Sequence, residues 1–203
     1  MLAALTGAGL SAAAGLNAYI PFLLVALIAR FTEVLNLPVQ YAWIESWWAI
    51  GIAAVLLLSE VVLDKVAIVD HINDAIGTFI RPATGGLIFA ATTAAEDLER
   101  GSSFLQDNPW VGVLLGILTA GLVHTTKAVA RPVVNASTGG LGTPVVSAAE
   151  DGVAITLSLV AIFLPVLVIF LVLLLVWGGF VLWRRRRARR QERDRVMAEA
   201  GYR

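Results

Sequence analysis

The chain has 203 residues, of which 58% are hydrophobic and only 15% are charged, and its mean hydropathy is +0.81. Soluble domains are about 45–50% apolar and about 25% charged, so these values exclude an ordinary water-soluble globule and indicate a membrane protein. The sequence contains no cysteine, which excludes disulfides, thiolate metal ligands and a cysteine nucleophile.

Charge is distributed unevenly along the chain, although the formal net charge is zero. Residues 1–183 contain 6 Lys and Arg against 12 Asp and Glu, whereas residues 184–203 contain 9 Arg against 3 Asp and Glu. We therefore predict a membrane domain over 1–183 and an arginine-rich tail over 184–203. Because positive charge beside a span favours the cytoplasmic side, the tail predicts a cytoplasmic C-terminus. The tail is also a candidate contact for anionic lipid, and no nucleic-acid partner is expected.

Four apolar segments are long enough to cross a bilayer, whose hydrocarbon core needs about 20 helical residues. The predicted spans are residues 8–29, 47–63, 110–128 and 165–183. Pro165 divides the uncharged stretch 152–183, which is too long for one crossing. With four spans and a cytoplasmic C-terminus, the N-terminus is also predicted to be cytoplasmic. Trp43, Trp47 and Trp48 lie where an aromatic belt would meet the membrane surface.

Two further segments are interrupted by proline and glycine. The interruptions are Arg81-Pro82 and Gly85-Gly86 in the first segment, and Arg131-Pro132, Gly139-Gly140 and Pro144 in the second. A proline removes a helical hydrogen bond and clashes with the preceding turn, so no continuous helix is expected through Pro82. We predict that residues 83–94 and 132–148 form short broken or re-entrant pieces.

An internal repeat is also visible in the sequence. Thr-Gly-Gly-Leu occurs at 84–87 and again at 138–141, and Ala-Ala-Glu-Asp occurs at 94–97 and again at 148–151. Both pairs share one offset of 54 residues, and small transporters are often built from repeats with broken helices. The predicted fold is therefore all-α, a polytopic membrane helical bundle of about four full spans plus two broken or re-entrant segments.

Charged residues lie beside the predicted helix breaks. His124, Lys127 and Arg131 are three and four residues apart, so they share one face of a helix. Acidic pairs with the four-residue spacing occur at 60 and 64 and at 70 and 74. Ionisable groups at membrane depth pair with one another or line a hydrated path. Two interpretations are open, an anion site built on Lys127 and Arg131, and a network of structural ion pairs between helices.

Other kinds of site have little support in the sequence. Two histidines without cysteine do not suggest a transition-metal site, and no cofactor is predicted. The protease pattern HExxH and the hydrolase pattern GxSxG are absent. Lys127, Arg131 and Pro132 match residue types of a motif in membrane phosphatidic-acid phosphatases, but not its spacing. A lipid-modifying enzyme is therefore the weakest hypothesis, and we expect a protein that is not an enzyme.

The polar residues together form a long and specific pattern. It consists of Gly15-Leu16-Asn17-Ala18-Tyr19 with Pro21, Asp64-Lys65, Asp70-His71-Ile72-Asn73-Asp74, Phe79-Ile80-Arg81-Pro82, His124-Thr125-Thr126-Lys127-Ala128, Arg131-Pro132, Asn135, Thr138-Gly139-Gly140, Pro144, Ser147 and Glu150-Asp151. This pattern resembles the domain of unknown function 4126 family of bacterial integral membrane proteins. The resemblance covers roughly residues 5–180 and excludes the tail. It implies a multi-span protein of the cell inner membrane and no established activity.

The leading hypothesis is a small transporter or channel for an anion or an anionic headgroup. Its candidate substrate-binding residues are Asn17, Tyr19, Arg81, His124, Lys127, Arg131, Asn135, Thr138, Gly139 and Gly140. Its candidate coupling or ion-pair residues are Glu60, Asp64, Asp70, Asp74, Glu150 and Asp151. The alternative is a structural or accessory membrane subunit in which the same charges pair between helices. Four spans enclose little room, so a homo-oligomer in the lipid bilayer is expected.

Overall fold

A computed structural model of the chain describes residues 2–64, 67–95, 104–139 and 141–170, with Leu173 and Arg184; for residues 67–74, Gln106 and Asn135 it describes the backbone alone. Every regular element in this described part is a helix, as predicted. The chain divides into one compact unit over Met1–Val168 and a second over Ile169–Arg203. The predicted tail beyond Arg184, and the predicted domain boundary before it, lie outside the described residues.

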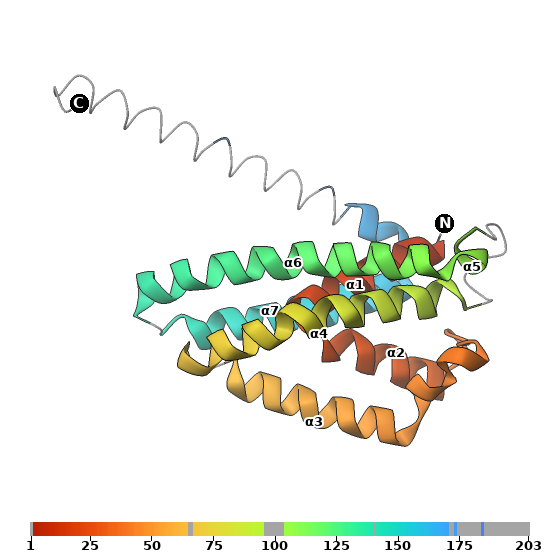
Figure 1. Cartoon of the computed structure of the whole chain (residues 1–203), viewed down its shortest axis with the longest axis horizontal. Coiled ribbons are helices and arrows are strands. Elements are labelled where there is room, and N and C mark those ends of the chain that lie inside the picture. The colour runs from red at the N-terminus through yellow and green to blue at the C-terminus, as the bar shows by residue number, and fades with distance from the viewer. Residues whose placement is uncertain are drawn as a thin grey trace. The chain divides into compact units, whose positions relative to one another are not determined.

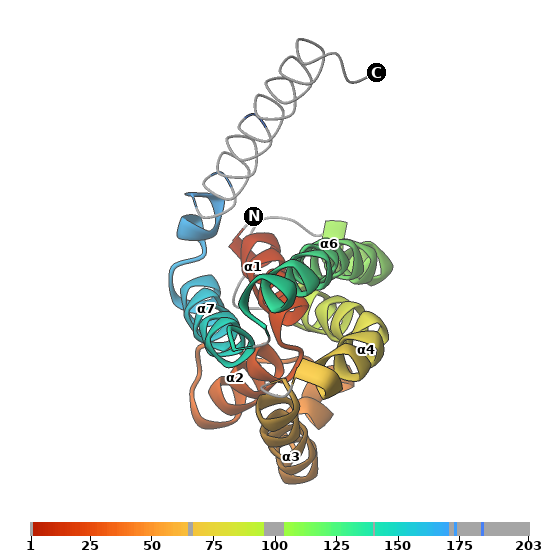
Figure 2. The same ribbon diagram turned by 90° about the vertical axis from the view of Figure 1, so that its left-hand side faces the viewer.

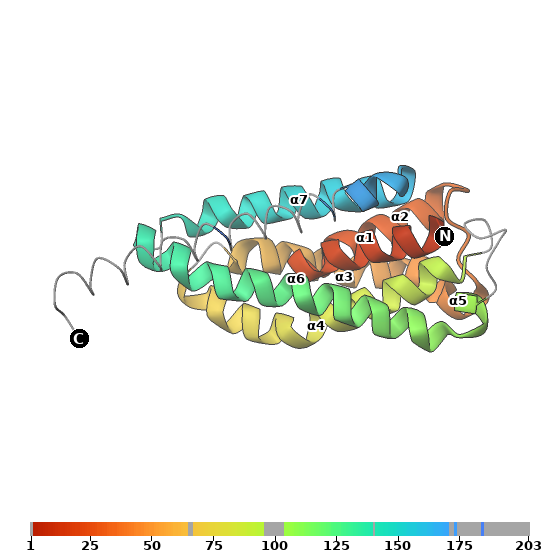
Figure 3. The same ribbon diagram turned by 90° about the horizontal axis from the view of Figure 1, so that it is seen from above.

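The first apolar stretch folds as a hairpin of two short helices. α1 (Leu2–Leu16) and α2 (Tyr19–Phe31) have 15 and 13 residues, and at about 1.5 Å per residue neither covers a hydrocarbon core of about 30 Å. Figures 1 and 3 show α2 running back toward the end of the bundle where the chain begins. The predicted single span over 8–29 is therefore wrong. The reason is Asn17, whose Oδ1 accepts hydrogen bonds from the first two backbone N–H groups of α2 at 3.0 and 3.2 Å and so starts a new helix.

The helix predicted over residues 47–63 is confirmed as α3 (Trp47–Leu63). It follows a 3-10 helix, η1 (Val39–Glu45), and the two axes meet at 53°. Ser46 stabilises this bend, because its hydroxyl caps α3 by accepting a hydrogen bond from the N–H of Ala49 at 3.3 Å. Trp47 and Trp48 are exposed at the junction, as residues of an interfacial aromatic belt should be.

The two longest helices contradict the predicted breaks at proline. α4 (Ala67–Thr93) contains Pro82, and α6 (Pro109–Thr138) contains Pro132. The predicted broken piece over 83–94 is therefore wrong, since it belongs to one continuous helix. Membrane helices tolerate proline because neighbouring helices and side chains re-satisfy the backbone groups that it frees. A short helix, α5 (Phe104–Asp107), precedes α6.

Glycines bring α4 and α6 into close contact. A Cβ atom on Gly116 of α6 would lie 2.3 Å from the carbonyl oxygen of Gly85, and one on Gly86 would lie 3.0 Å from the carbonyl oxygen of Val113. No side chain fits between backbones at these distances. Gly85 and Gly86 therefore serve a helix–helix contact of the kind that small residues permit in membranes.

α7 (Thr143–Phe163) begins after Gly139, Leu141 and Gly142, which lie in turns. Gly139 has a φ of +59°, a conformation that favours glycine. Among the described residues of the predicted broken piece 132–148, the helices are interrupted at Gly139, Leu141 and Gly142 and nowhere else. α7 ends before Pro165, as predicted. The first Thr-Gly-Gly-Leu sequence lies inside α4, whereas the second begins at the last residue of α6, and the predicted internal repeat is not confirmed.

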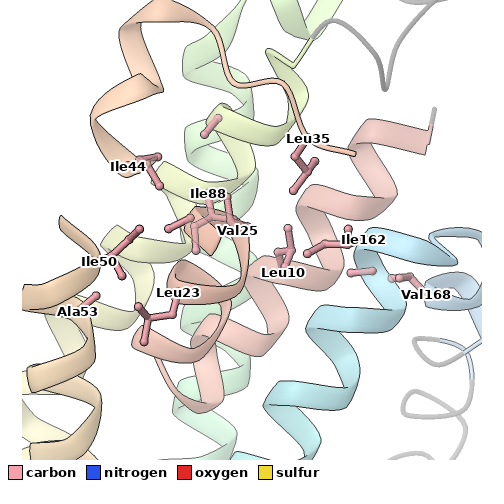
Figure 4. Close-up of a cluster of buried hydrophobic side chains, with 13 residues drawn as sticks. Leu10, Leu23, Val25, Leu35, Ile44, Ile50, Ala53, Ile88, Ile162 and Val168 are labelled. Carbon is pink, nitrogen blue, oxygen red and sulfur yellow. The ribbon is translucent and has the colours of Figure 1, made fainter. Parts of the chain in front are cut away.

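α1 occupies the centre of the bundle. It contacts α4, α6 and α7, while α2 and α3 lie together on another side (Figure 2). Small residues of α1 allow its neighbours to come close, because Gly7 faces Phe89 and Gly9 faces Ala161. The largest apolar cluster lies around α1 and includes Leu10, Val25 and Ile88 (Figure 4).

The bundle has two distinct ends (Figure 1). The hairpin-base end holds the start of α1, the end of α2, η1 and α5. The far end holds the end of α3, the start of α4 and the turn between α6 and α7. Within the described ranges, α6 and α7 are each long and apolar enough to cross a membrane, and η1 with α3 forms a third candidate if it counts as one bent span. These helices are those of a membrane protein, whereas the predicted number of four spans is not confirmed.

Candidate functional site: a buried charge network

Seven ionisable side chains from four helical regions meet inside the bundle, and we call them the charge network. They are Glu60 and Asp64 at the end of α3, Arg81 of α4, His124, Lys127 and Arg131 of α6, and Glu150 of α7. Arg81 lies 14 residues from the start of α4 and 12 from its end (67 to 81 and 81 to 93). Arg81 is therefore far from both ends of this helix and buried inside the bundle, where ionisable groups need partners.

Arg81 connects α3 with α4 and α6. Its Nη2 donates to Glu60 Oε1 at 2.8 Å, and both side chains are almost completely buried, at 1% and 5% exposure. Its Nη1 lies 2.8 Å from His124 Nδ1. A guanidinium group can only donate, so Nδ1 must accept and the ring hydrogen must lie on Nε2. Nε2 lies 3.1 Å from the hydroxyl of Thr78, which completes a chain of four groups.

Asp64 lies at the centre of the network. One of its oxygens, Oδ2, is 3.3 Å from Lys127 Nζ, 3.0 Å from Arg131 Nη2 and 4.0 Å from Arg81 Nη2. Asp64 follows the last residue of α3, and its backbone N–H donates to the carbonyl oxygen of Glu60. The end of α3 is thus fixed by three cations that come from two other helices.

Glu150 closes the network on the α7 side. It forms an ion pair with Arg131 and lies 3.2 Å from Lys127 Nζ. With 16% of its side chain exposed, Glu150 is the least buried carboxylate of the network. The two cations of α6 therefore lie between a carboxylate at the end of α3 and one on α7.

The tip of the α1–α2 hairpin docks onto this network. Lys127 Nζ donates to the carbonyl oxygen of Leu16 at 2.9 Å, where α1 ends. Asn17 Nδ2 donates to Asp151 Oδ1 at 2.9 Å. The carbonyl end of a helix carries partial negative charge, so a lysine there is favourable. One amide side chain thus starts α2 and ties the hairpin to α7.

The electrostatics of the site do not favour an anion. Among the described side chains, the three cations of the network face four carboxylates when Asp151 is counted. With His124 neutral, fully ionised groups would sum to −1. Each cation also lies within 4.0 Å of at least one carboxylate oxygen. An added anion would have to displace these carboxylates, at the cost of leaving them buried without a counter-charge.

A very small cavity adjoins the network at Glu60. It measures about 10 Å³, and Tyr19, Gly77 and Arg81 contribute to its wall. Glu60 Oε2 has no hydrogen-bond partner within the part of the chain that the structure describes. A space of this size is close to the lower limit for one water molecule, which would satisfy that oxygen.

The structure brings together most of the residues that the sequence suggested for a site. The predicted residues that meet in or beside the network are Asn17, Glu60, Asp64, Arg81, His124, Lys127, Arg131, Glu150 and Asp151. Tyr19 is half-buried beside the Glu60 cavity. Thr138 and Gly139 lie apart, exposed at the α6–α7 turn, where Thr138 Oγ1 accepts from the N–H of Gly142 at 3.0 Å.

Some predicted residues cannot be placed in the site. Gly140 and the side chains of Asp70, Asp74 and Asn135 lie outside the described part. Thr78 and the carbonyl of Leu16 are network contacts that the sequence did not suggest, because no motif links a threonine or a backbone oxygen to charges on other helices. Among the described residues, no group of three His, Asp or Glu side chains is arranged to hold a metal ion.

The sequence of this chain matches one family model over residues 4–185, and the description of that family is "Domain of unknown function (DUF4126)". The matched residues include the whole charge network and all of the hairpin except Leu2 and Ala3. No curated protein and no solved structure matches the chain. The match shows the family but no function, so the function has to be argued from the geometry of the site.

Proposed function

The chain belongs to the DUF4126 family, and from the charge network we propose that it is a structural or accessory membrane protein, in which buried ion pairs hold a re-entrant hairpin against the other helices. The observation that carries this proposal is the mutual pairing of the network. Arg131 pairs with Glu150 and Asp64, Arg81 pairs with Glu60, and Lys127 lies between Asp64 and Glu150. Each of these buried charges thus has a counter-charge on another helix, as an ion-pair network that holds helices together requires.

Two observations count against the leading sequence hypothesis of an anion transporter. A transport site needs a cation that is open to its substrate, whereas Arg81, Lys127 and Arg131 are all buried beside carboxylates. A larger cavity, elsewhere in the described part of the bundle, has walls that are mainly apolar, and no residue of the network lines it. Geometry and charge therefore favour the structural hypothesis.

Solute flux into proteoliposomes tests the proposal. We expect folded protein in vesicles to give no flux above that of empty vesicles for chloride, phosphate, sulfate and short carboxylates. A saturable flux of any of these anions that is lost in Arg131→Gln, but kept in the exposed-site variant Arg30→Gln, would overturn the structural proposal and restore the anion transporter.

A second candidate function, passage of a proton or a cation, rests on one further observation. With Asp151 counted, the described side chains carry one more carboxylate than cations, and Glu60, which lines the small cavity, has an Oε2 atom without a hydrogen-bond partner in the described part of the chain. An excess negative charge at membrane depth favours uptake of a proton or a cation. This candidate predicts proton or cation flux that depends on Glu60.

A pH-sensitive dye trapped in the same vesicles separates the two candidates. Under a pH gradient or a membrane potential, the structural proposal expects equal proton leak in vesicles with the native protein, with Glu60→Gln and with Glu33→Gln. Glu33 is an exposed carboxylate outside the network and serves as the matched control. Faster leak that Glu60→Gln alone abolishes would support proton passage and contradict a purely structural role.

A further inference from the structure

A larger cavity of about 190 Å³ lies among α2, η1, α3 and α4, and we call it the apolar groove. Its wall is mainly apolar and includes Phe22 of α2, Trp43 of η1, Ile52 and Leu56 of α3, and Leu87 of α4. None of the charge network residues contributes to it. The groove is therefore a separate feature, and a ligand bound in it would be independent of the proposed function.

One end of the apolar groove is built from stacked aromatic rings. Trp43 and Trp48 stack with centroids 5.9 Å apart and planes 15° apart, and Phe22 lies 6.1 Å from Trp43. All three line the groove. Tryptophans gather at the level of lipid headgroups, so this end marks the membrane surface. The bend between η1 and α3 places both tryptophans there.

From the tryptophans the groove runs along α3 toward the interior. Trp48 and Leu56 are eight residues apart on this helix, a rise of about 12 Å at 1.5 Å per residue. The groove therefore extends from the level of the headgroups into the hydrocarbon region. Tyr19 and Thr84 contribute the only hydroxyl-bearing side chains among its lining residues.

The dimensions favour a single hydrocarbon chain as the occupant. A dry apolar cavity of about 150 Å³ is enough to hold a benzene-sized molecule, so about 190 Å³ suits a run of several methylene groups. A helix of a partner protein has a diameter of about 10 Å and needs far more room. Soluble ligands with charged groups would find no counter-charge in this wall.

We propose that the apolar groove binds one acyl chain of a membrane phospholipid, with the headgroup at the level of Trp43 and Trp48. The aromatic rings then pack against the upper methylene groups, and the aliphatic side chains of α3 and α4 pack against the lower ones. Because the ligand is part of the bilayer, the site would remain occupied at all times and would fill the space between the hairpin and α3.

Photo-crosslinking in proteoliposomes tests this site. The full chain is reconstituted with phosphatidylcholine that carries a diazirine midway along one acyl chain, and adducts are mapped by peptide mass spectrometry after illumination. We expect adducts to concentrate on groove residues such as Leu56 and Leu87. Val55 of the same helix is exposed but does not line the groove, so its adducts report surrounding lipid and set the background.

A matched pair of variants provides the control. Ile52→Trp fills the groove from its exposed edge, and Val55→Trp adds the same bulk outside it; the native side chains are 54% and 66% exposed, so both variants are expected to fold. Adducts in the groove should be lost in the Ile52 variant and kept in the Val55 variant. Even labelling of all outward-facing residues, unchanged by Ile52→Trp, would show ordinary surrounding lipid only and overturn the proposal.

Discussion

Arg81 is almost fully buried and contacts three other residues of the charge network, so substitution of Arg81 should affect the network strongly. Removing one partner of a buried ion pair leaves the other as an uncompensated charge, whereas replacing both with apolar residues is often neutral or stabilising. If the pair only holds helices together, replacing both residues with apolar ones should restore the free energy of unfolding that a single substitution loses.

We predict that Arg81→Met lowers the free energy of unfolding by about 3 kcal/mol, because Glu60 then keeps its charge without a partner. The double variant Glu60→Leu with Arg81→Met should recover most of this loss. Thermal and denaturant unfolding in a mild detergent measure both. Arg30→Met, at an exposed arginine outside the network, removes a hydrogen bond to the Glu45 carbonyl and a cation–π contact with Trp47, and should cost less, about 1 kcal/mol. If the double variant were as unstable as the single one, the pair would not act as a simple structural lock.

Asn17 is the residue that determines the hairpin. Its side chain caps α2 and donates to Asp151, so Asn17→Ala removes both interactions. We predict a loss of about 1–2 kcal/mol, the usual range for an N-cap substitution. Asn36→Ala in the exposed loop before η1 is the matched control. Equal stability of the two variants, measured by the same unfolding experiments, would mean that the cap contributes nothing to the hairpin.

At the level of single residues, the sequence predicted which residues belong to the site better than it predicted which of them contact one another. The spacing of His124, Lys127 and Arg131 correctly places them on one face of a helix. The pairing of Arg81 with Glu60 could not be predicted, since the two residues are 21 apart in sequence and meet only because α3 and α4 fold against each other. The same holds for Thr78 and His124, which are 46 residues apart.

At the level of helices, Pro82 and Pro132 do not break the chain as predicted, whereas Gly139 and Pro165 do interrupt helices. Pro82 and Pro132 were expected to end helices, but both lie inside long ones, because a bundle can satisfy the backbone groups that a proline frees. The break occurs instead at Asn17, a polar residue inside an uncharged stretch, whose capping ability was the available signal. Helix propensity alone could not predict that helices continue through Pro82 and Pro132 but stop at Asn17, because contacts between helices determine where each helix ends.

The contact between α4 and α6 depends on glycine, and one substitution tests it. A Cβ atom at position 116 would lie 2.3 Å from the carbonyl oxygen of Gly85, so Gly116→Ala must push the helices apart. We predict a loss of about 2 kcal/mol, within the range for overpacking. Gly152→Ala is the matched control in α7, since nothing lies within 4 Å of its new Cβ atom.

The control should be stabilised, by about 0.5–1 kcal/mol, because alanine is a better helix former than glycine. Both values come from unfolding curves of the variants and the native protein under one set of conditions. A neutral Gly116→Ala variant would contradict the close contact between α4 and α6.

At the level of the whole molecule, the hairpin bears on the expected topology, because α1 and α2 return to the same end of the bundle. If α3, α4, α6 and α7, which run alternately between the two ends, each cross the membrane, the predicted span over 165–183 would be a fifth crossing. An odd number of crossings places the two termini on opposite sides. The sequence prediction of a cytoplasmic N-terminus rested on counting residues 8–29 as a span, and it loses its basis.

The distribution of charge agrees with this revised topology. The connections near the hairpin-base end, residues 30–46 and 96–107, contain 2 Arg against 6 Asp and Glu. Toward the far end, the connection between α3 and α4 contains Lys65, and a fifth crossing would deliver the 9 Arg of the tail to the same side. Since positive charge stays in the cytoplasm, we predict that the far end is cytoplasmic and that the hairpin-base end faces outward.

Single cysteines test this topology without background, because the native chain contains none. Val39 at the hairpin-base end and Leu141 at the far end are strongly exposed, at 93% and 85%. In intact cells, a membrane-impermeant maleimide should label Val39→Cys, and it should label Leu141→Cys and Gly201→Cys only after permeabilisation. The reverse pattern would invert the topology. Labelling of both Val39→Cys and Gly201→Cys in intact cells would place the termini on one side, which would require the hairpin or the last predicted span to cross differently.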